Sequence, residues 1–400
     1  MPLRMTFAAI VLAALSLALF LFRIEVPPVA VYPDESYYVP AARSLLNGGP
    51  DTASWHPPLG KLMIAGGIEV LGDRALGWRF ASAVCGSATL VAIFFWAYLL
   101  LGDFPLALLA AILTLFNNFL FVMARTAMLD SVYFAFVMLG VLAFTASFVC
   151  DVSTRAKRVL MLWSGLMFGA GMACKWNAVV FLGCVVLISG YLFRYDRSKV
   201  LKIGVPVLLL ALFAIPFGAY YLTFVGTSLW THSSPSFREF IAANQFMWHW
   251  HRIVPGNPTL NVRWYRWFFR ASPERGLAYL MGNWVVAWTG VLAILLCIWG
   301  LWKKPAESLP ELSVVLLYGT NVLQWLVIPQ KSTCYYYYYP SMMVLGVAVA
   351  IVLSRSTVRQ ILGLRVSVVL IAASFVFFLY CYPRMAALQA PYDCALGCWP

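Results

Sequence analysis

Two adjacent carboxylates, Asp34 and Glu35, stand in the polar stretch that follows the first apolar segment of the chain. One interpretation is structural, because Asp34 can cap a helix and Glu35 is favoured by the positive end of a helix dipole. The other is chemical, because partial desolvation at a membrane surface makes a carboxylate a stronger base. The pair is therefore a candidate base with a positioning neighbour.

Two lysines follow in sequence contexts that restrict what they can do. Lys61 ends the sequence Trp-His-Pro-Pro-Leu-Gly-Lys from Trp55, whose prolines and glycine predict a rigid turn. Lys175 interrupts an apolar stretch, which is costly unless its ammonium reaches water or a partner. The nearest acidic residue in the sequence is Asp196, which is predicted on the opposite membrane face, so no local ion pair is expected for Lys175.

Further polar residues mark the ends of later apolar segments. Arg125 and Asp130 stand five positions apart and can pair with each other or bind a ligand. Five consecutive tyrosines, Tyr335–Tyr339, follow Lys331, which is typical of a lined binding site. The remaining candidate side chains are His56, Arg79, Trp176, Gln324 and Tyr337. One acidic pair among several cations predicts an anionic, lipid-linked substrate whose reacting centre needs a base.

The rest of the chain must hold these groups in a membrane. Hydrophobic residues make up 62% of the 400 residues and charged residues 11%, whereas soluble domains carry about 25% charged residues. This composition excludes soluble enzymes, secreted disulfide scaffolds and disordered chains. Unbroken apolar runs such as residues 91–101 favour helices over a membrane β-barrel. The net charge of +13 is distributed between apolar runs, so no nucleic-acid partner is expected.

Eleven apolar windows predict an all-α polytopic membrane protein of about eleven transmembrane helices. The windows lie near residues 6–22, 80–101, 106–123, 131–150, 159–174, 176–193, 203–225, 278–302, 312–329, 340–354 and 366–382. The fifth and sixth are short enough to form one re-entrant hairpin instead. Twelve Lys and Arg residues follow even-numbered windows in short loops, against three after odd-numbered windows. The positive-inside rule therefore predicts a cytoplasmic N-terminus and an outer C-terminus.

Two long stretches contain no apolar window. Residues 23–79 form the predicted first outer loop, which carries the catalytic motif, and residues 226–277 form the second outer loop. The whole of residues 1–400 is predicted to be one transmembrane domain. All candidate acids and cations then face outward, where membrane lipids are natural partners. The nine cysteines follow no metal-ligand or redox spacing, and a Cys394–Cys398 disulfide is left open.

The order of these motifs resembles that of the dolichyl-phosphate-mannose protein O-mannosyltransferases, a family of GT-C membrane glycosyltransferases. The matching segments are Asp34-Glu35, His56–Lys61, Arg79–Gly86, Arg125–Ser131, Lys175-Trp176, Gly282–Trp284 and Gln324–Pro340. The chain differs in two respects. Residues 226–277 are too few for the large soluble domain of eukaryotic members, so a short form is expected. Asn117-Asn118 stands where members often have Asp-Asn.

The resemblance implies a GT-C bundle with amphipathic helices in its outer loops and an inverting sugar transfer. The sugar, mannose in this family, would move from polyprenyl phosphate to a hydroxyl of protein Ser or Thr. Asp34 would take the hydroxyl proton, and Glu35 would position the acceptor or support Asp34. The expected ligands of the donor phosphate are Arg125, Lys175, Lys331 and Lys61. His56, Arg79, Asp130, Trp176, Gln324 and Tyr337 are expected to bind substrate or to support the site.

The chemistry of the donor simplifies the expected machinery. A leaving phosphate is already anionic, with a second pKa of about 6, so one base suffices where a glycosidase needs two carboxyl groups. No metal site and no required cofactor are predicted, and a need for a divalent metal is left open. The expected location is a bacterial inner membrane, with the active site on its outer face. The alternatives are a lipid or glycan acceptor, and a transporter or flippase, which would carry internal repeats.

Overall fold

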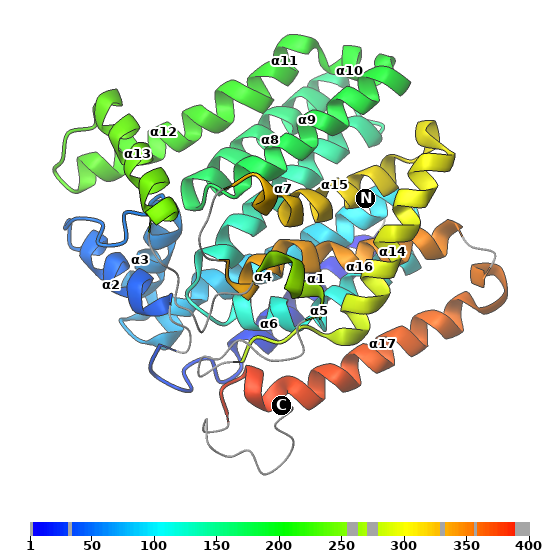
Figure 1. The fold of residues 1–400 in the computed structure, drawn as a ribbon, viewed down its shortest axis with the longest axis horizontal. Helices are drawn as coiled ribbons and strands as arrows, with labels where there is room; N and C mark the ends of the chain where they lie inside the picture. The colour runs from blue at the N-terminus through cyan, green and yellow to red at the C-terminus, as the bar shows by residue number, and fades with distance from the viewer. Residues whose placement is uncertain are drawn as a thin grey trace.

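The computed structural model describes residues 3–30, 34–253, 263–269, 279–328, 333–355 and 358–388. Figure 1 shows a bundle of helices in which the long elements run across the molecule and the shorter α2, α3 and α13 gather at one end. The described residues form helices and connecting turns without a β-strand. The predicted all-α polytopic class is confirmed.

Eight helical segments are long and apolar enough to cross a membrane, and one bent pair can form a ninth. The eight are α1 (Leu3–Leu21), α4 (Ala75–Leu101), α7 (Leu129–Val149), α9 (Ala178–Tyr195), the run Val205–Trp230 through α11 (Val205–Leu209) and α12 (Ile215–Trp230), α14 (Trp284–Lys303), Tyr335–Arg355 ending in α16 (Tyr339–Arg355), and Arg365–Met385 in α17 (Val358–Met385). The bent pair is α5 (Phe104–Leu115) and α6 (Asn118–Ala124), which meet at 61°.

All eleven predicted windows fall on helices, but two of these helices are not both long and apolar enough to count as membrane-crossing helices. α8 (Thr154–Cys174) begins with several basic residues, which lower its mean hydropathy, and α15 (Leu309–Leu323) has 15 residues, fewer than the ~20 of a straight span. α8 and α9 are 21 and 18 residues long, so each is a full helix and not half of a short hairpin. The number of crossings and their sidedness stay predictions.

The core lies around α7 and α16. Within their spanning windows, 78% of the residues of α7 and 83% of the Tyr335–Arg355 segment are buried, against 22% for α1 and 17% for α17. The inner pair therefore packs against protein on most sides, while α1 and α17 present most of their surface outward, as Figure 1 shows for α17 along one edge. Polar groups carried by the ends of the central helices are held in fixed positions.

The stretch 23–79 contains two helices, α2 (Glu35–Leu46) and α3 (Leu59–Leu71), which pack on each other, and α3 also packs on α4. The second stretch begins later than predicted, because α12 continues to Trp230, and it carries the amphipathic helix α13 (Phe237–Ile253). Close packing explains why the motif Trp55–Lys61 has a glycine at position 60, because a Cβ there would approach Leu129 Cδ2 to 2.6 Å. A residue without a side chain thus lets α3 start directly against the first turn of α7.

Candidate functional site

Four separate segments bring acids, a lysine and tyrosines together. Asp34 immediately precedes α2, Asp130 lies in the first turn of α7, and Lys175 directly follows α8. The tyrosines come from the 3-10 turn η5 (Tyr335–Tyr338). Because α7 and α8 are consecutive helices packed along each other, the start of one lies beside the end of the other. Helix packing therefore creates a site that no local sequence window contains.

Lys175 forms a buried ion pair with Asp130. The ammonium Nζ lies 2.9 Å from both Oδ1 and Oδ2 of Asp130, and each side chain is 2% exposed. The rings of Tyr133, Tyr336 and Tyr337 surround it, with centroids at 5.9, 5.4 and 4.7 Å from Nζ. The sequence predicts no local ion pair for Lys175, and its partner is indeed not local, because Asp130 lies 45 residues away in the sequence.

Asp34 has the features of a base. Its side chain makes no capping hydrogen bond to α2, so the capping interpretation is wrong. The hydroxyl of Tyr336 hydrogen-bonds to the carboxylate, while Oδ2 is shielded from solvent and has no hydrogen-bond partner among the described residues. Burial raises the pKa of Asp34 from 3.8 to about 6, against the lowering effects of Tyr336 and Lys175. A carboxylate with this pKa is ionised at pH 7 and still basic.

Glu35 points into the protein and not toward Asp34 or an open site. Its Oε1 lies 2.9 Å from Nε of Arg79 and accepts a hydrogen bond of 2.7 Å from the backbone N–H of Ala127. Arg79 also donates to the carbonyls of Ile24, at 2.6 Å, and Val29, at 2.7 Å. Both side chains are almost fully buried. Glu35 and Arg79 thus fix the segment that leads to Asp34, and a direct contact with an acceptor stays a prediction for both.

Arg125 serves the end of α1. Its guanidinium donates to the carbonyls of Phe20 at 2.7 Å, Phe22 at 2.6 Å and Arg23 at 3.2 Å. A cation at this position is favoured by the negative end of a helix dipole. The pair with Asp130 that the spacing allowed does not form, since Asp130 bonds to Lys175.

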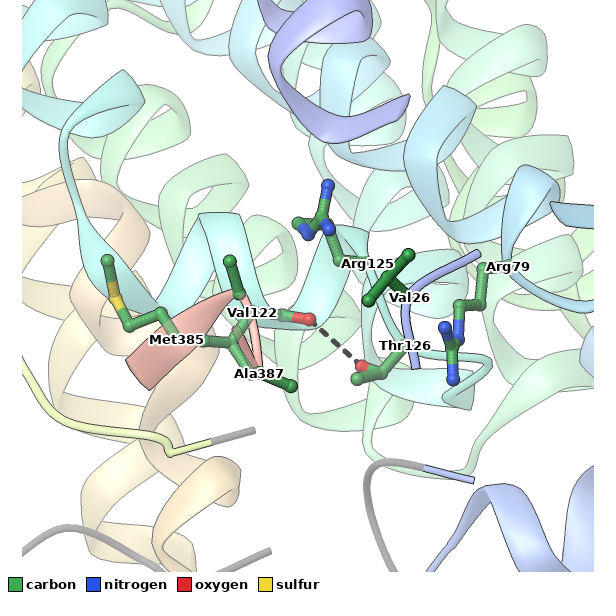
Figure 2. Close-up of a pocket in the computed structure, with 8 residues that line it drawn as sticks. Val26, Arg79, Val122, Arg125, Thr126, Met385 and Ala387 are labelled. Atoms are coloured by element: carbon green, nitrogen blue, oxygen red, sulfur yellow. Dashed lines mark hydrogen bonds between the residues drawn. The ribbon is translucent and has the colours of Figure 1, made fainter. Parts of the chain in front are cut away.

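Figure 2 shows Arg79 and Arg125 as linings of one small pocket, together with Val26, Val122, Thr126, Met385 and Ala387. Neither Asp34 nor Lys175 lines this pocket. The structure therefore does not place Arg125 beside the candidate base, and its expected role as a phosphate ligand has no support from this geometry.

Lys61 closes its own turn. The ammonium pairs with Asp51 and donates to the carbonyls of Ala53 and His56, both at 2.7 Å. Because an ammonium has three N–H groups, these partners satisfy it completely. Lys61 therefore supports the turn in this structure, and a contact with donor phosphate stays a prediction.

His56 has a partner that the sequence did not identify, His251 of α13. Their ring centroids are 5.0 Å apart, and His251 Nε2 lies 3.0 Å from the carbonyl oxygen of Trp55. Trp250 stacks on Trp55 at 5.2 Å. Burial, chiefly, lowers the pKa of both imidazoles, so both are neutral at pH 7. The sequence signal for this pairing was the presence of histidines in the second stretch, and His251 lies almost 200 residues after Trp55.

The remaining predicted residues lie around this centre. Trp176 donates through Nε1 to the hydroxyl of Tyr220 at 3.1 Å, on the side of α12. Gln324 donates to the carbonyl of Asn321 at 3.0 Å, and Tyr337 stacks on Trp325 at 5.2 Å. Lys331, Cys394 and Cys398 lie outside the described residues. Over the described ranges, no group of three His, Cys, Asp or Glu side chains could hold a metal ion.

Comparison with known sequences agrees with the resemblance. Residues 55–221 match the model of the family described as dolichyl-phosphate-mannose-protein mannosyltransferase. The polyprenol-phosphate-mannose–protein mannosyltransferase of Mycolicibacterium smegmatis is 29% identical over 191 residues, which are 40% of this chain and 36% of that protein. The protein of the same name from Mycobacterium tuberculosis is 25% identical over 344 residues, 74% of this chain and 63% of that protein. The chain thus spans less than two thirds of either relative.

Comparison with solved structures confirms the fold. The protein O-mannosyltransferase Pmt1-Pmt2 complex of S. cerevisiae, bound to the sugar donor, gives a TM-score of 0.84 at 13% identity and covers 98% of this chain and 91% of that one. ArnT from Cupriavidus metallidurans, bound to undecaprenyl phosphate, gives 0.62 at 15% identity over 94% and 74% of the two chains. The chain is therefore a multi-pass membrane protein with the GT-C fold and a relative of the dolichyl-phosphate-mannose-protein mannosyltransferases.

Proposed function

We propose that this protein is an inverting glycosyltransferase that moves mannose from a polyprenyl-phosphate carrier to a hydroxyl of a protein Ser or Thr. The observation that carries this proposal is the shielded Oδ2 of Asp34, which has no hydrogen-bond partner among the described residues, in a carboxyl group with a pKa of about 6, near the charge of Lys175. Both sequence relatives are named as mannosyltransferases that use polyprenol-phosphate-mannose and act on protein, which supports this donor and this acceptor.

The proposed reaction is a single displacement at the anomeric carbon. Asp34 Oδ2 accepts the proton of the acceptor hydroxyl while the oxygen of that hydroxyl forms the new bond to the anomeric carbon. The bond from the carbon to the phosphate oxygen breaks, and the electron pair leaves with polyprenyl phosphate. A general base of this kind contributes about 10²- to 10⁴-fold to a rate. Inversion follows because attack and departure take place on opposite faces of the sugar.

Lys175 supplies the positive charge for the leaving phosphate in this proposal. Negative charge grows on that phosphate in the transition state, and a fixed cation in a water-poor site stabilises it strongly. The tyrosine rings around Lys175 keep water away from the ammonium. No cofactor has a role in the proposed step, because the base and the leaving-group cation both come from the chain.

We place the active site on the outer face of a bacterial inner membrane, with the N-terminus in the cytoplasm. The support is the distribution of lysine and arginine among the short loops, read with the positive-inside rule. In Figure 1, the helices α2, α3 and α13 lie at one end of the bundle.

A direct assay tests the proposed function. Purified protein in detergent is incubated with polyprenyl-phosphate-mannose and a peptide that contains Ser and Thr, and a matched reaction receives a glycolipid acceptor. The proposal predicts mannosyl peptide with the anomeric configuration inverted relative to the donor. Transfer to the glycolipid but not to the peptide would show that the acceptor is a lipid and not a protein. Binding of donor without transfer to either acceptor would contradict the enzymatic proposal.

A further inference from the structure

The two buried lysines of the outer region differ in how their ammonium groups are satisfied. Lys61 has three partners for its three N–H groups, namely Asp51 and two backbone carbonyls. Lys175 has only the two oxygens of Asp130 as hydrogen-bond acceptors among the described residues. One N–H of Lys175 therefore lacks a protein acceptor in this part of the chain. The first lysine closes a turn, whereas the second has a donor left for a ligand.

We propose that Asp130 is a positioning residue for the donor phosphate: it holds the Lys175 ammonium where the remaining N–H meets that phosphate. This inference rests on the proposed function. The class of ligand is a phosphodiester that joins a sugar to a polyprenyl chain. Asp130 itself does not touch the phosphate, because both of its oxygens are bonded to Nζ.

Geometry explains why the lysine needs such a partner. A lysine ammonium is a compact charge on a flexible four-carbon stem. Lys175 follows the last residue of α8 with an extended backbone, so α8 itself does not direct the side chain. Asp130 is fixed in the first turn of α7, the central helix, and contacts Nζ symmetrically at 2.9 Å through both oxygens. The acid thus converts a mobile charge into one with a defined position.

Stability alone gives little reason for the pair. Buried ion pairs contribute little net stability compared with apolar residues of the same shape, since both charges must be desolvated. The pair also lies beside the candidate base, because the charges of Lys175 and Asp130 both act on Asp34. A structural pair could stand anywhere in the bundle, whereas this one stands where the phosphate must leave.

Donor affinity is the first test. Wild type, Asp130→Asn and Asp130→Glu are titrated with polyprenyl-phosphate-mannose in detergent, and their thermal unfolding is recorded. Asp130→Glu keeps the charge and the ion pair but moves the carboxylate by one methylene, so it is expected to fold. Loss of one charge-assisted contact predicts donor binding weaker by about 10-fold or more in each folded variant. Unchanged affinity in folded Asp130→Glu would overturn the positioning role.

A double-mutant cycle shows whether Asp130 acts through Lys175. In a Lys175→Met background, adding Asp130→Asn should weaken donor binding by less than 2-fold, roughly the scatter of independent measurements. Additive losses would mean that Asp130 acts without Lys175, which contradicts the proposal. The control is Asp196→Asn, which breaks an exposed Asp–Lys pair with Lys199 and should leave donor binding unchanged.

The pH profile tests whether Asp130 is electrostatically coupled to the candidate base Asp34. The titratable and charged groups that act on Asp34 or respond to it are Tyr38, Asp130, Lys175, Tyr336 and Tyr337. Asp130 raises the pKa of Asp34 and Lys175 lowers it. Asp130→Asn should therefore move the acid limb of kcat/KM to lower pH, and an unmoved limb would contradict the coupling. If the wild-type protein binds no donor, the proposed function itself fails. If wild type and the Asp130 variants bind donor equally, only the positioning role of Asp130 fails.

Discussion

At the scale of single residues, the site separates two neighbouring carboxylates by their surroundings. Asp34 bonds to Tyr336 and has one oxygen without a hydrogen-bond partner in the part of the chain that the structure describes, whereas Glu35 bonds to Arg79 and the N–H of Ala127. Burial raises the pKa of Asp34, whereas Glu35 is held in an ion pair with Arg79. In the proposed mechanism, a carboxylate thus serves as a base at one position and as a structural anchor at the next.

The raised pKa of Asp34 predicts a specific pH dependence. The base must be ionised, so kcat/KM should be constant above pH 7 and fall about tenfold per pH unit below pH 6. The sign follows from the direction of the shift, since a carboxyl with the ordinary value of 3.8 would remain active to pH 4. Measuring kcat/KM for transfer between pH 4.5 and 8 tests this. A profile flat to pH 4.5 would exclude Asp34 as a base with this pKa.

Glu35→Gln tests the anchor role. The change leaves the buried guanidinium of Arg79 without its charged partner, and breaking a buried pair in this way costs about 3–5 kcal/mol. Thermal unfolding of the variant should shift to clearly lower temperature, and transfer should fall because the segment before Asp34 loses its anchor. The control is Asp73→Asn, which breaks an exposed pair with Arg43 and should cost less than about 1 kcal/mol. Equal stability of the two variants would contradict the assignment.

At the scale of elements, the close packing of α3 on α4 holds α3 and its neighbour α2 in place. A Cβ on Gly67 would collide with the backbone carbonyl oxygen of Gly77, whereas nothing lies within 4 Å of a Cβ on Gly66. The two neighbouring glycines of one helix therefore give a matched pair of substitutions.

Gly67→Ala should lower stability and transfer, because backbone cannot yield as a side chain can and α3 must move away from α4. Gly66→Ala should raise stability by about 0.5–1 kcal/mol, since alanine favours the helix and the space is open. Unfolding temperature and transfer rate of the two variants decide the question. Equal behaviour of both would show that α3 and α4 do not meet at Gly67.

The motifs predicted the members of the site better than their pairings. Asp130, Lys175 and Tyr337 are local signals because they stand at or near the ends of apolar windows, and Asp34 and His56 are local signals within the polar stretch 23–79. Their contacts depend on which helix ends meet, and this information lies in the packing of α7 on α8. The spacing therefore favoured an Arg125–Asp130 pair that does not form, since Arg125 reaches the end of α1 instead. His251 was missed because α13 folds back onto residues almost 200 positions earlier.

At the scale of the whole molecule, the apolar windows located every helix of the described residues that is long and apolar enough to cross a membrane, but not the amphipathic helix α13. The number of membrane crossings is less direct, since α8 starts with basic residues and α15 is short. Reporter fusions at Lys199 and after Arg384 test the proposed topology. Eleven crossings place these positions on opposite faces, cytoplasmic and outer respectively, and signals from the same face would contradict that count.

The central claim is that Asp34 is the base of a transfer from polyprenyl phosphate. The most direct measurement compares wild type with Asp34→Asn for mannosyl transfer and for donor binding on the same purified samples. The account predicts that donor affinity changes by less than about 3-fold while the transfer rate falls by about 10²- to 10⁴-fold, the usual loss on removing a general base. Transfer at the wild-type rate by folded Asp34→Asn protein would contradict it.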